Sequence, residues 1–431
     1  MGKIRFVLYS LIIIAIFVLI HLLFTFILPA SWSMWIQKTN ELFTGVRLQF
    51  LGLFILGAFL FVVFAILYGT AFLASFGKAD YPKGSEGFLP AISVLMPAIN
   101  EENIISDTLN SFVATSYPKD KLELVIIASG STDQTAEICR GFKDRLNIQV
   151  LTDPLEKKGK PAALNYGLKH ASNEIIVVYD ADTQLQEITL QALVRHLYNP
   201  AIVATSGPVI VRNWNDNKLT KGIALEYTYV SGTGLYHEIR NRLGRSLWVM
   251  GRNYAIRKKV IEEVGGWNED ALTEDLHLSS QLSARKLKIK YAPDAKINEK
   301  VPNTYATFKK QRRRWLGGFN QSLSAAMELD KRSVILRNFG MMHYGHIADF
   351  SVGAIIAAIL FGLFGEFFIM IVCLSIFIFN FGMIVIAIRK YGERKYRLLL
   401  YYFVYIFIDM FMFLNQFRSI EEMEWEKTDL S

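Results

Sequence analysis

Cysteine is nearly absent from this sequence of 431 residues, which contains only Cys139 and Cys373. Cys139 lies in a polar stretch and Cys373 in an apolar run, which excludes a disulfide scaffold and a cluster of thiolate metal ligands. Charged residues are also scarce, at 20%, whereas hydrophobic residues make up 52% of the chain. This balance excludes a disordered chain and argues against an entirely soluble protein.

Negative charge is outnumbered, with 39 Asp and Glu against 47 Lys and Arg, so the formal net charge is +8. Such an excess suits nucleic acid, a membrane surface or an anionic substrate. Most of the excess lies beside apolar segments and in the run 309–314. The sequence therefore predicts membrane lipids as partners and no nucleic acid, and charge alone does not choose the substrate.

Four apolar segments are long enough to cross a hydrocarbon core of about 30 Å. They are 7–29, 48–75, 367–388 and 398–416. The segment 350–365 is shorter, so it either spans at a tilt or is re-entrant. A cleaved signal peptide is the alternative for the first segment, but its apolar run exceeds the usual ~7–15 residues and no small-residue cleavage site follows.

Basic residues gather at one end of each of these segments. They are Lys3, Arg5, Lys78, Lys83, Lys331, Arg332, Arg337, Arg389, Lys390, Arg394, Lys395 and Arg397. If five helices span, all these ends lie on one side, which the positive-inside rule makes the cytoplasm. We therefore expect a multi-pass integral protein of the cell membrane, with the large polar segment in the cytoplasm.

The chain divides into four predicted parts. Two N-terminal transmembrane helices occupy 1–75, a cytoplasmic domain 76–304, amphipathic interface helices 305–343, and about three further transmembrane helices with an acidic tail 344–431. The polar part from 76 to 343 is ample for a core of its own.

Within the cytoplasmic domain, short β-branched runs alternate with polar stretches of helical character. The runs are 91–97, 122–128, 148–153, 174–182 and 201–207. This pattern predicts an α/β fold with a Rossmann-like, mostly parallel sheet, in which ligands bind beyond the carboxyl ends of the strands. Neither G-x-x-x-x-G-K-[ST] nor G-x-G-x-x-G follows the first run, which weighs against P-loop hydrolases and dinucleotide oxidoreductases.

Three motifs on the polar segment carry chemistry. Asp180-Ala181-Asp182 ends a strand and can hold Mg²⁺ or Mn²⁺, although two solvated turn aspartates are the alternative. Thr273-Glu274-Asp275 is a second acidic cluster, for which a capped helix start is the alternative. In 311–315, Gln311, Arg314 and Trp315 share one helical face; a juxtamembrane basic run is the alternative.

Taken together and in this order, these motifs resemble those of the membrane-embedded family 2 glycosyltransferases. That group contains the cellulose, hyaluronan and poly-N-acetylglucosamine synthases and ceramide glucosyltransferase-like enzymes. The matching stretches are 97–102, 130–133, 159–165, 180–182, 273–275 and 311–315. The resemblance implies a GT-A fold, a nucleotide-diphosphate sugar donor, a divalent metal and inversion at the anomeric carbon.

The resemblance also implies roles for individual residues. Asp275 matches the position of the catalytic base, with Glu274 beside it, and Gln311, Arg314 and Trp315 complete the catalytic set. Asp180 and Asp182 match the metal position. Donor-binding positions are Pro97, Asn100, Glu101, Ser129, Lys160, Asp180 and Arg314.

Trp315 can offer a flat face to an acceptor sugar ring. Arg252 belongs to a stretch, 251–257, similar to the family segment that contacts the acceptor, although an ordinary turn before a helix explains it nearly as well.

The base-binding corner departs from the family. Many relatives have Tyr where Ile99 stands, and one or two Asp where Ala128 and Ser129 stand. Ile99 offers no hydroxyl and Ser129 no charge. We expect UDP as the nucleotide, with GDP or dTDP left open.

Two products and one non-enzymatic function remain open. The leading hypothesis is a polysaccharide elongated at the cytoplasmic face and passed through the protein's own helices, because a polar polymer needs a lined path across hydrocarbon. The alternative product is a glycolipid, made on a lipid acceptor. A membrane transporter or receptor with a nucleotide-sensing domain would bind a metal nucleotide without turnover.

Overall fold

The computed structural model describes residues 69–70, 72–77, 80–157, 159–230, 234–244, 248–345, 354–356, 358–360, 363 and 367–415. The chain forms two compact units, Met1–Gly77 and Lys78–Ser431. The predicted span 7–29 and most of 48–75 lie outside the described residues, as does much of 350–365. The second unit contains all the motifs that carry chemistry.

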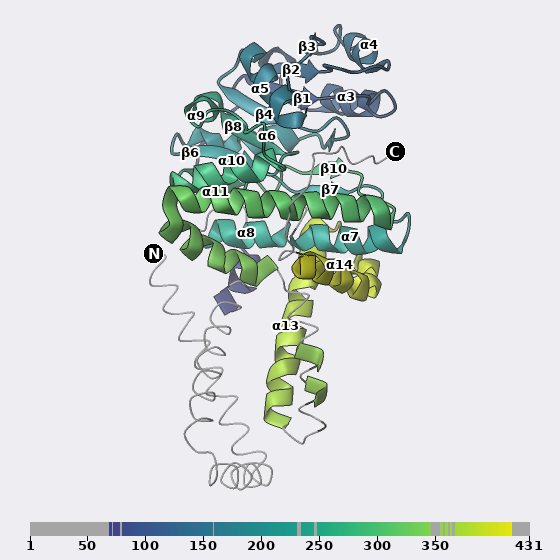
Figure 1. Ribbon diagram of the computed structural model, residues 1–431, viewed down its shortest axis with the longest axis vertical. Coiled ribbons are helices and arrows are strands. Elements are labelled where there is room, and N and C mark those ends of the chain that lie inside the picture. Colours follow the sequence, from purple (N-terminus) through teal and green to yellow (C-terminus); the bar gives the residue numbers. More distant parts are fainter. Residues whose placement is uncertain are drawn as a thin grey trace. The chain divides into compact units, whose positions relative to one another are not determined.

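A seven-stranded sheet, counted over the described residues, has the strand order β3-β2-β1-β4-β8-β6-β9 (Figure 1). The strands are β1 (Ile92–Pro97), β2 (Leu122–Ile127), β3 (Asn147–Leu151), β4 (Ile175–Val178), β6 (Ile202–Ser206), β8 (Tyr254–Arg257) and β9 (Lys288–Tyr291). Only β8 among them runs antiparallel to its neighbours. This is a mostly parallel, Rossmann-type sheet of the GT-A kind, as the sequence predicts.

The strands form where the sequence has β-branched and other apolar runs. Every residue of β4 is buried, and all but the last residue of β1. Strands that are covered on both faces need apolar side chains on both sides, which is why these runs show no alternation. The sheet therefore holds the core of the domain, and the chain segments that leave it carry the polar groups.

Helices and short turns connect the strands. They are α3 (Ile105–Ala114), η1 (Lys119–Lys121), α4 (Thr135–Arg140), α5 (Lys160–His170), α6 (Thr189–Val194), η2 (Arg195–Tyr198), α9 (Lys258–Glu263) and α10 (Glu274–Ala284). Helix α5 packs closely on the sheet, because a Cβ at Gly167 would lie 2.8 Å from Cδ1 of Ile127. The close packing fixes the position of α5 on the sheet, and with it the position of Lys160, the first residue of the helix.

A smaller sheet and three helices form a second layer beneath the main sheet (Figure 1). In the small sheet, β10 (Ile297–Glu299) lies between β5 (Gln184–Leu185) and β7 (Val209–Val211). The helices are α7 (Lys218–Tyr229), α8 (Leu235–Arg242) and α11 (Tyr305–Gly345). Helix α11 contains the whole of the 311–315 motif.

The C-terminal part consists of α13 (Phe367–Tyr391), η3 (Tyr396–Tyr401) and α14 (Tyr402–Asn415). Within the described residues, Cys373–Tyr391 is the one segment long and apolar enough to cross a membrane, and Tyr396–Ile408 is a shorter apolar helix. The predicted span at 367–388 coincides with α13. The one at 398–416 is not confirmed, because η3 and α14 pack against α7.

Candidate active site

The loops after β1 and β2 are joined through Asn100. Its backbone N–H donates to Oγ of Ser131 at 2.8 Å, and its Oδ1 accepts from the backbone N–H of Thr132 at 2.9 Å. Asn100 has a φ of +55°, in the left-handed region that Asn tolerates better than most residues. The next residue, Glu101, donates its N–H to Oγ1 of Thr135 at 2.8 Å. These predicted donor-binding residues therefore lie together at the carboxyl edge of the sheet.

Two other predicted donor-binding residues lie at the ends of the same strands. Pro97 is the last residue of β1, and Ser129 follows β2. Ser129 is buried, and its hydroxyl has no hydrogen-bond partner within the described residues. A buried polar group without a partner is available to a ligand.

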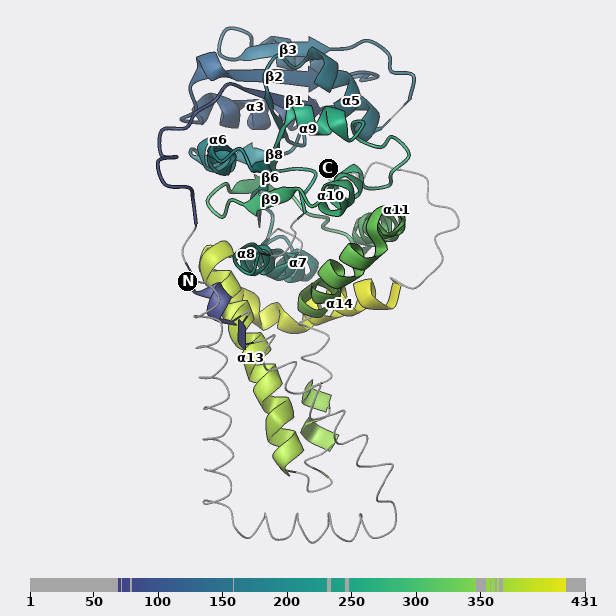
Figure 2. The same cartoon turned by 90° about the vertical axis from the view of Figure 1, so that its left-hand side faces the viewer.

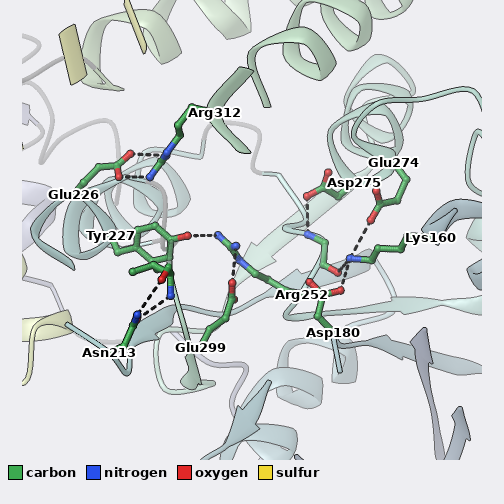
Figure 3. A network of polar contacts seen from close by, with 12 residues as sticks. Lys160, Asp180, Asn213, Glu226, Tyr227, Arg252, Glu274, Asp275, Glu299 and Arg312 are labelled. Carbon is green, nitrogen blue, oxygen red and sulfur yellow. Dashed lines mark hydrogen bonds and ion pairs between the residues drawn. The ribbon is translucent and has the colours of Figure 1, made fainter. Parts of the chain in front are cut away.

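Lys160 joins three segments that are distant in the sequence (Figure 3). Its Nζ lies 2.6 Å from Oδ1 of Asp180, 3.1 Å from Oε1 of Glu274 and 2.7 Å from the carbonyl oxygen of Gly251, to which it donates a hydrogen bond. Burial disfavours the charge on Lys160, but the carboxylates of Asp180 and Glu274 outweigh it and raise the pKa of the lysine. Burial also raises the pKa of Glu274, against the effect of Lys160.

Asp275 is held by backbone groups rather than by a cation. Its Oδ2 accepts from the N–H of Gly251 at 2.7 Å, and its Oδ1 accepts from the N–H of Leu276 at 2.8 Å. A carboxylate has about four lone-pair sites, so these two hydrogen bonds leave room for a hydroxyl donor. Thr273 is the N-cap residue of α10, but its side chain makes no capping hydrogen bond, and its hydroxyl is buried without a partner among the described residues.

The peptide of Gly251 therefore contacts both groups, since its carbonyl accepts from Lys160 and its N–H donates to Asp275. A Cβ at Gly251 would lie 3.0–3.1 Å from charged atoms of Glu274, Asp275 and Lys160. Only glycine fits this close approach without displacing them.

Arg252, the residue after Gly251, belongs to a second cluster with Glu299 and Tyr227 (Figure 3). Its Nη1 lies 2.9 Å from Oε1 of Glu299, and its Nη2 donates to the hydroxyl of Tyr227 at 3.2 Å. The guanidinium also lies 5.3 Å from the ring centroid of Trp315, within the range of a cation–π interaction. The two predicted acceptor residues, Arg252 and Trp315, are thus in contact.

Glu299 is a member of this cluster that sequence reasoning missed. Its pKa is raised to about 8, mainly by burial and also by the carboxylates of Asp182 and Asp180, while Arg252 opposes the shift. Glu299 ends β10, a strand too short to show alternation. No sequence motif contains Glu299, so its position beside Arg252 becomes evident only from the structure of the small sheet.

The alternative interpretation of 251–257 as a turn before a helix is wrong for its second half. Residues Tyr254–Arg257 form strand β8, and α9 begins only at Lys258. Because β8 runs antiparallel to its neighbours, it begins at the edge where they end. Gly251 and Arg252 reach the site for this reason.

The residues of the 311–315 motif on α11 differ in their burial and in their contacts. Arg312 is fully buried and forms a bidentate ion pair with Glu226, and it lies 4.4 Å from the ring centroid of Trp315. Gln311 is buried, and Arg314 is half-buried. No hydrogen bond or ion pair joins Gln311 or Arg314 to the two clusters within the described residues.

Helix α11 nevertheless packs directly on the start of α10. A Cβ at Gly318 would lie 2.0 Å from Oγ1 of Thr273, and Oε1 of Gln321 accepts from the N–H of Leu272 at 3.0 Å. Arg314 precedes Gly318 by one helical turn, on the same face. The helix that carries Arg314 and Trp315 therefore contacts the residue that precedes Glu274.

Asp180 and Asp182 carry carboxylate oxygens, the type of ligand that Mg²⁺ prefers in proteins. The pKa of Asp182 is raised to about 7, mainly by burial and also by the carboxylates of Asp180 and Glu101, while Arg252 opposes the shift. A cation would stabilise the charge that this environment disfavours. No group of three or more His, Cys, Asp or Glu side chains that could hold a metal ion occurs in the described residues.

Comparison with known proteins agrees with this architecture. A family description, Glycosyl transferase family group 2, matches residues 175–388. The chain is 30% identical over 386 residues to a probable glycosyltransferase, YdaM, of Bacillus subtilis, a match that covers 82% of this chain and 90% of that one. It is 33% identical over 236 residues to a poly-β-1,6-N-acetyl-D-glucosamine synthase of Staphylococcus aureus, and that match covers 54% of this chain and 56% of the synthase.

Among solved structures, a mannosyltransferase of Pyrobaculum calidifontis in complex with GDP-Man and Mn²⁺ is 20% identical, with a TM-score of 0.47 over 76% of this chain and 94% of that one. The similarity to YdaM extends over most of both sequences. The chain belongs to the family 2 glycosyltransferases and is a glycosyltransferase.

Proposed function

We propose that this protein is a metal-dependent, inverting glycosyltransferase of the membrane, which elongates a polysaccharide from a nucleotide-diphosphate sugar. The observation that carries this proposal is the peptide of Gly251, which contacts Asp275 and Lys160 at once. It holds a base candidate and a cationic group side by side. Inversion in one step needs such a base on the face of the sugar opposite the leaving group.

In this reaction the acceptor hydroxyl attacks the anomeric carbon and its proton passes to the carboxylate of Asp275. The bond from the anomeric carbon to the diphosphate oxygen breaks, and its electron pair leaves with the nucleoside diphosphate. Asp180 and Asp182 would hold Mg²⁺ or Mn²⁺, which neutralises charge on the diphosphate. Arg314 would add a guanidinium on the same leaving group.

The other residues orient the substrates. Asn100, Glu101, Pro97 and Ser129 would line the nucleotide side, and UDP remains the nucleotide we favour. Trp315 would receive the acceptor ring on its face, and Arg252 would hydrogen-bond to its hydroxyl groups. Lys160 on α5, Glu274 on α10 and Gln311 on α11 would support these groups.

The product we favour is a polymer. The Staphylococcus aureus relative is a poly-β-1,6-N-acetyl-D-glucosamine synthase, and α13 offers a candidate membrane span beside the domain. Release through several spanning helices is part of this proposal. A glycolipid product remains the second candidate.

The test uses the full chain in nanodiscs, offered UDP-, GDP- and dTDP-sugars with Mg²⁺ or Mn²⁺. Released nucleoside diphosphate and product size are measured. We expect UDP release and a product of high mass; a single-sugar, organic-soluble product would identify a glycolipid synthase. Nucleotide binding without release by the unmodified chain would identify a sensor.

Asp275→Asn tests the base. We expect transfer to fall by about 10²- to 10⁴-fold while nucleotide binding persists. Asp270→Asn is the matched control, because Asp270 lies in the loop just before α10 but is exposed and pairs with Lys157 at 3.1 Å. Equal transfer by the two variants would refute the role of Asp275.

A further inference from the structure

The small sheet brings Glu299 close to the D-x-D motif. Glu299 is the last residue of β10, which pairs with β5, the strand that begins two residues after Asp182. In this antiparallel pair, Asn298 lies opposite Gln184. Opposite residues of such strands have Cβ atoms about 4.5–5.5 Å apart, so continuing the register puts Glu299 next to Thr183. The strand pairing thus places a buried carboxylate beside the predicted metal ligand Asp182.

Arg252 is the cation that these carboxylates share. Its charge opposes the effect of burial, which raises the pKa of both Asp182 and Glu299. Burial lowers the pKa of Arg252 itself, but the charge of Glu299 outweighs burial, and Asp180 adds to the upward shift. Three acidic side chains therefore attract one guanidinium.

The guanidinium of Arg252 is bound to Glu299 (Figure 3). Its Nη1 lies 2.9 Å from Oε1 of Glu299, and its Nη2 donates to the hydroxyl of Tyr227 at 3.2 Å. In this position it lies 5.3 Å from the ring centroid of Trp315. Trp315 belongs to α11, the helix that packs along α10 (Figure 2). Glu299 and Tyr227 thus hold Arg252 on the side of the predicted acceptor residue.

The two aspartates of the D-x-D motif differ in how their charge is compensated. Asp180 already has a cation, because Nζ of Lys160 lies 2.6 Å from its Oδ1. The pKa of Asp182 is raised to about 7, mainly by burial, so its environment disfavours the ionised form. A cation that approaches Asp182 relieves this cost, whether it is a divalent metal ion or a guanidinium. A released Arg252 would therefore compete with metal for Asp182.

Stability alone does not account for the pair of Glu299 and Arg252. The side chains are 5% and 9% exposed, and desolvation largely offsets the attraction within a buried ion pair. In addition, Oε2 of Glu299 is buried and has no hydrogen-bond partner within the described residues, which costs further free energy. The pair is better explained by the position that it gives to Arg252.

We propose that Glu299 is a positioning residue, which holds the guanidinium of Arg252 on the acceptor side and keeps it from pairing with Asp182, so that Asp182 stays open to the divalent cation. The inference rests on the metal site contained in the proposed function. It is independent of the sugar that is transferred and of the product. Without Glu299, one arginine would leave the acceptor side and block the metal position.

Binding of Mn²⁺ measures this competition directly. The full chain in nanodiscs is titrated with Mn²⁺ in the presence of UDP and, separately, of GDP, and the electron paramagnetic resonance signal of free Mn²⁺ gives the dissociation constant. Loss of binding in Asp182→Asn assigns the signal to this site. In Glu299→Gln an isosteric amide has no charge to hold Arg252, so we expect the dissociation constant to rise about tenfold.

A shorter acid provides a second variant at the same position. Glu299→Asp keeps the charge but places it one methylene farther from Arg252. Its dissociation constant for Mn²⁺ should lie between those of the unmodified chain and of Glu299→Gln. This variant also tests the inference if Glu299→Gln does not fold.

Removal of the arginine separates positioning from a structural role. Arg252→Met combined with Glu299→Gln leaves no guanidinium to compete for Asp182, so Mn²⁺ binding should return to that of the unmodified chain. A structural defect would not be repaired in this way, because both members of the buried pair are then lost. Sugar transfer should stay low in the double variant, since Arg252 is missing from the acceptor side.

Glu226→Gln is the matched control. It removes one charge from another buried pair of glutamate and arginine, in which Oε2 of Glu226 binds Nη2 of Arg312 at 2.5 Å. This variant should lower the melting temperature and leave the dissociation constant for Mn²⁺ unchanged. Weaker Mn²⁺ binding in the control as well would attribute the effect to lost stability and overturn the role of Glu299.

The remaining outcomes separate this inference from the proposed function. Equal Mn²⁺ binding by the unmodified chain and by Glu299→Gln would overturn the inference alone. A double variant that binds Mn²⁺ as weakly as Glu299→Gln would also overturn it, because Arg252 would not be the competitor. An unmodified chain that binds no Mn²⁺ with either nucleotide would refute the metal site of the proposed function, and the inference with it.

Discussion

The guanidinium of Arg312 is bound by Glu226 through two hydrogen bonds, at 2.8 Å from Nη1 to Oε1 and 2.5 Å from Nη2 to Oε2. Both side chains are buried, because the Arg312 side chain is 0% exposed and the Glu226 side chain is 5% exposed. Of the three consecutive arginines in the motif, this one is a structural link between α11 and α7.

Breaking this pair is expected to destabilise the domain. Glu226→Gln leaves a buried guanidinium without its counter-charge, and the free energy of unfolding should fall by about 3–5 kcal/mol. Thermal unfolding in detergent measures the loss. Arg313→Gln is the matched control, because Arg313 is exposed on the same turn. An equal melting temperature for both variants would contradict the structural role.

A methyl group at position 318 should uncouple α11 from the start of α10. Gly318→Ala puts a Cβ 2.0 Å from Oγ1 of Thr273 and 2.7 Å from its Cβ, so the loop before Asp275 must shift. We expect transfer to fall by about 10²-fold, as for a displacement of about 1 Å in a catalytic group. Nucleotide binding should persist.

The reciprocal change provides the check on this contact. Thr273→Gly removes the clashing atoms, so the double variant should recover part of the transfer lost by Gly318→Ala. Gly382→Ala is the control, because a Cβ there meets nothing within 4 Å. A double variant as inactive as the single one would show that the contact is not the cause.

The stability of the domain should depend on pH through His196. The pKa of this imidazole is lowered to about 4, mainly by burial and also by Lys290 and Arg195, while the carbonyl of Tyr291 and Asp80 oppose the shift. Between about pH 6.5 and 4 the unfolded chain binds the proton and the folded chain does not, so the free energy of unfolding falls as the pH falls. The loss amounts to about 3 kcal/mol at the acid end.

His196→Gln should flatten this part of the profile. Its amide can still donate to the carbonyl of Tyr291, which now accepts from Nε2 of His196 at 3.1 Å, but it does not titrate. Denaturant unfolding at pH 7 and pH 5 measures the difference. An unchanged slope in the variant would show that the histidine is not the titrating group.

Removal of divalent metal should stop sugar transfer. A chelator is expected to abolish release of nucleoside diphosphate, and Mg²⁺ or Mn²⁺ to restore it, because the leaving group then loses its neutralising charge. Asp182→Asn should raise the metal concentration needed for half-maximal release. Asp120→Asn, at an exposed site on η1, should leave it unchanged. Full activity in the chelator would refute the metal site.

The main sheet could be predicted well because its strands are apolar throughout. Continuous β-branched runs at 91–97, 122–128 and 174–182 contain β1, β2 and β4, and the polar residues that follow them lie at one edge. Lys160, Asp180 and Glu274, which the motifs singled out, are indeed in contact.

Other parts of the site had no local signal. Strand β8 has only four residues, and its antiparallel direction follows from pairing with β4 and β6. Glu226 is 86 residues from Arg312 in the sequence, and nothing near either residue indicates the pairing. Short strands and distant ion pairs are decided by tertiary packing, which a single sequence does not display.

Lys390 and Tyr391, at the end of α13, bind the carboxylate of Glu238 on α8. Among the described residues, a polypeptide cut after α11 would leave that carboxylate paired with Arg242 alone, and it would expose the sides of α7 and α8 that α13 and α14 now cover. Such a fragment would aggregate in water, because its exposed apolar surface would associate with the same surface of other molecules. The catalytic domain and the helices α13 and α14 therefore fold together, and a shortened version for crystallisation should keep all residues through 415.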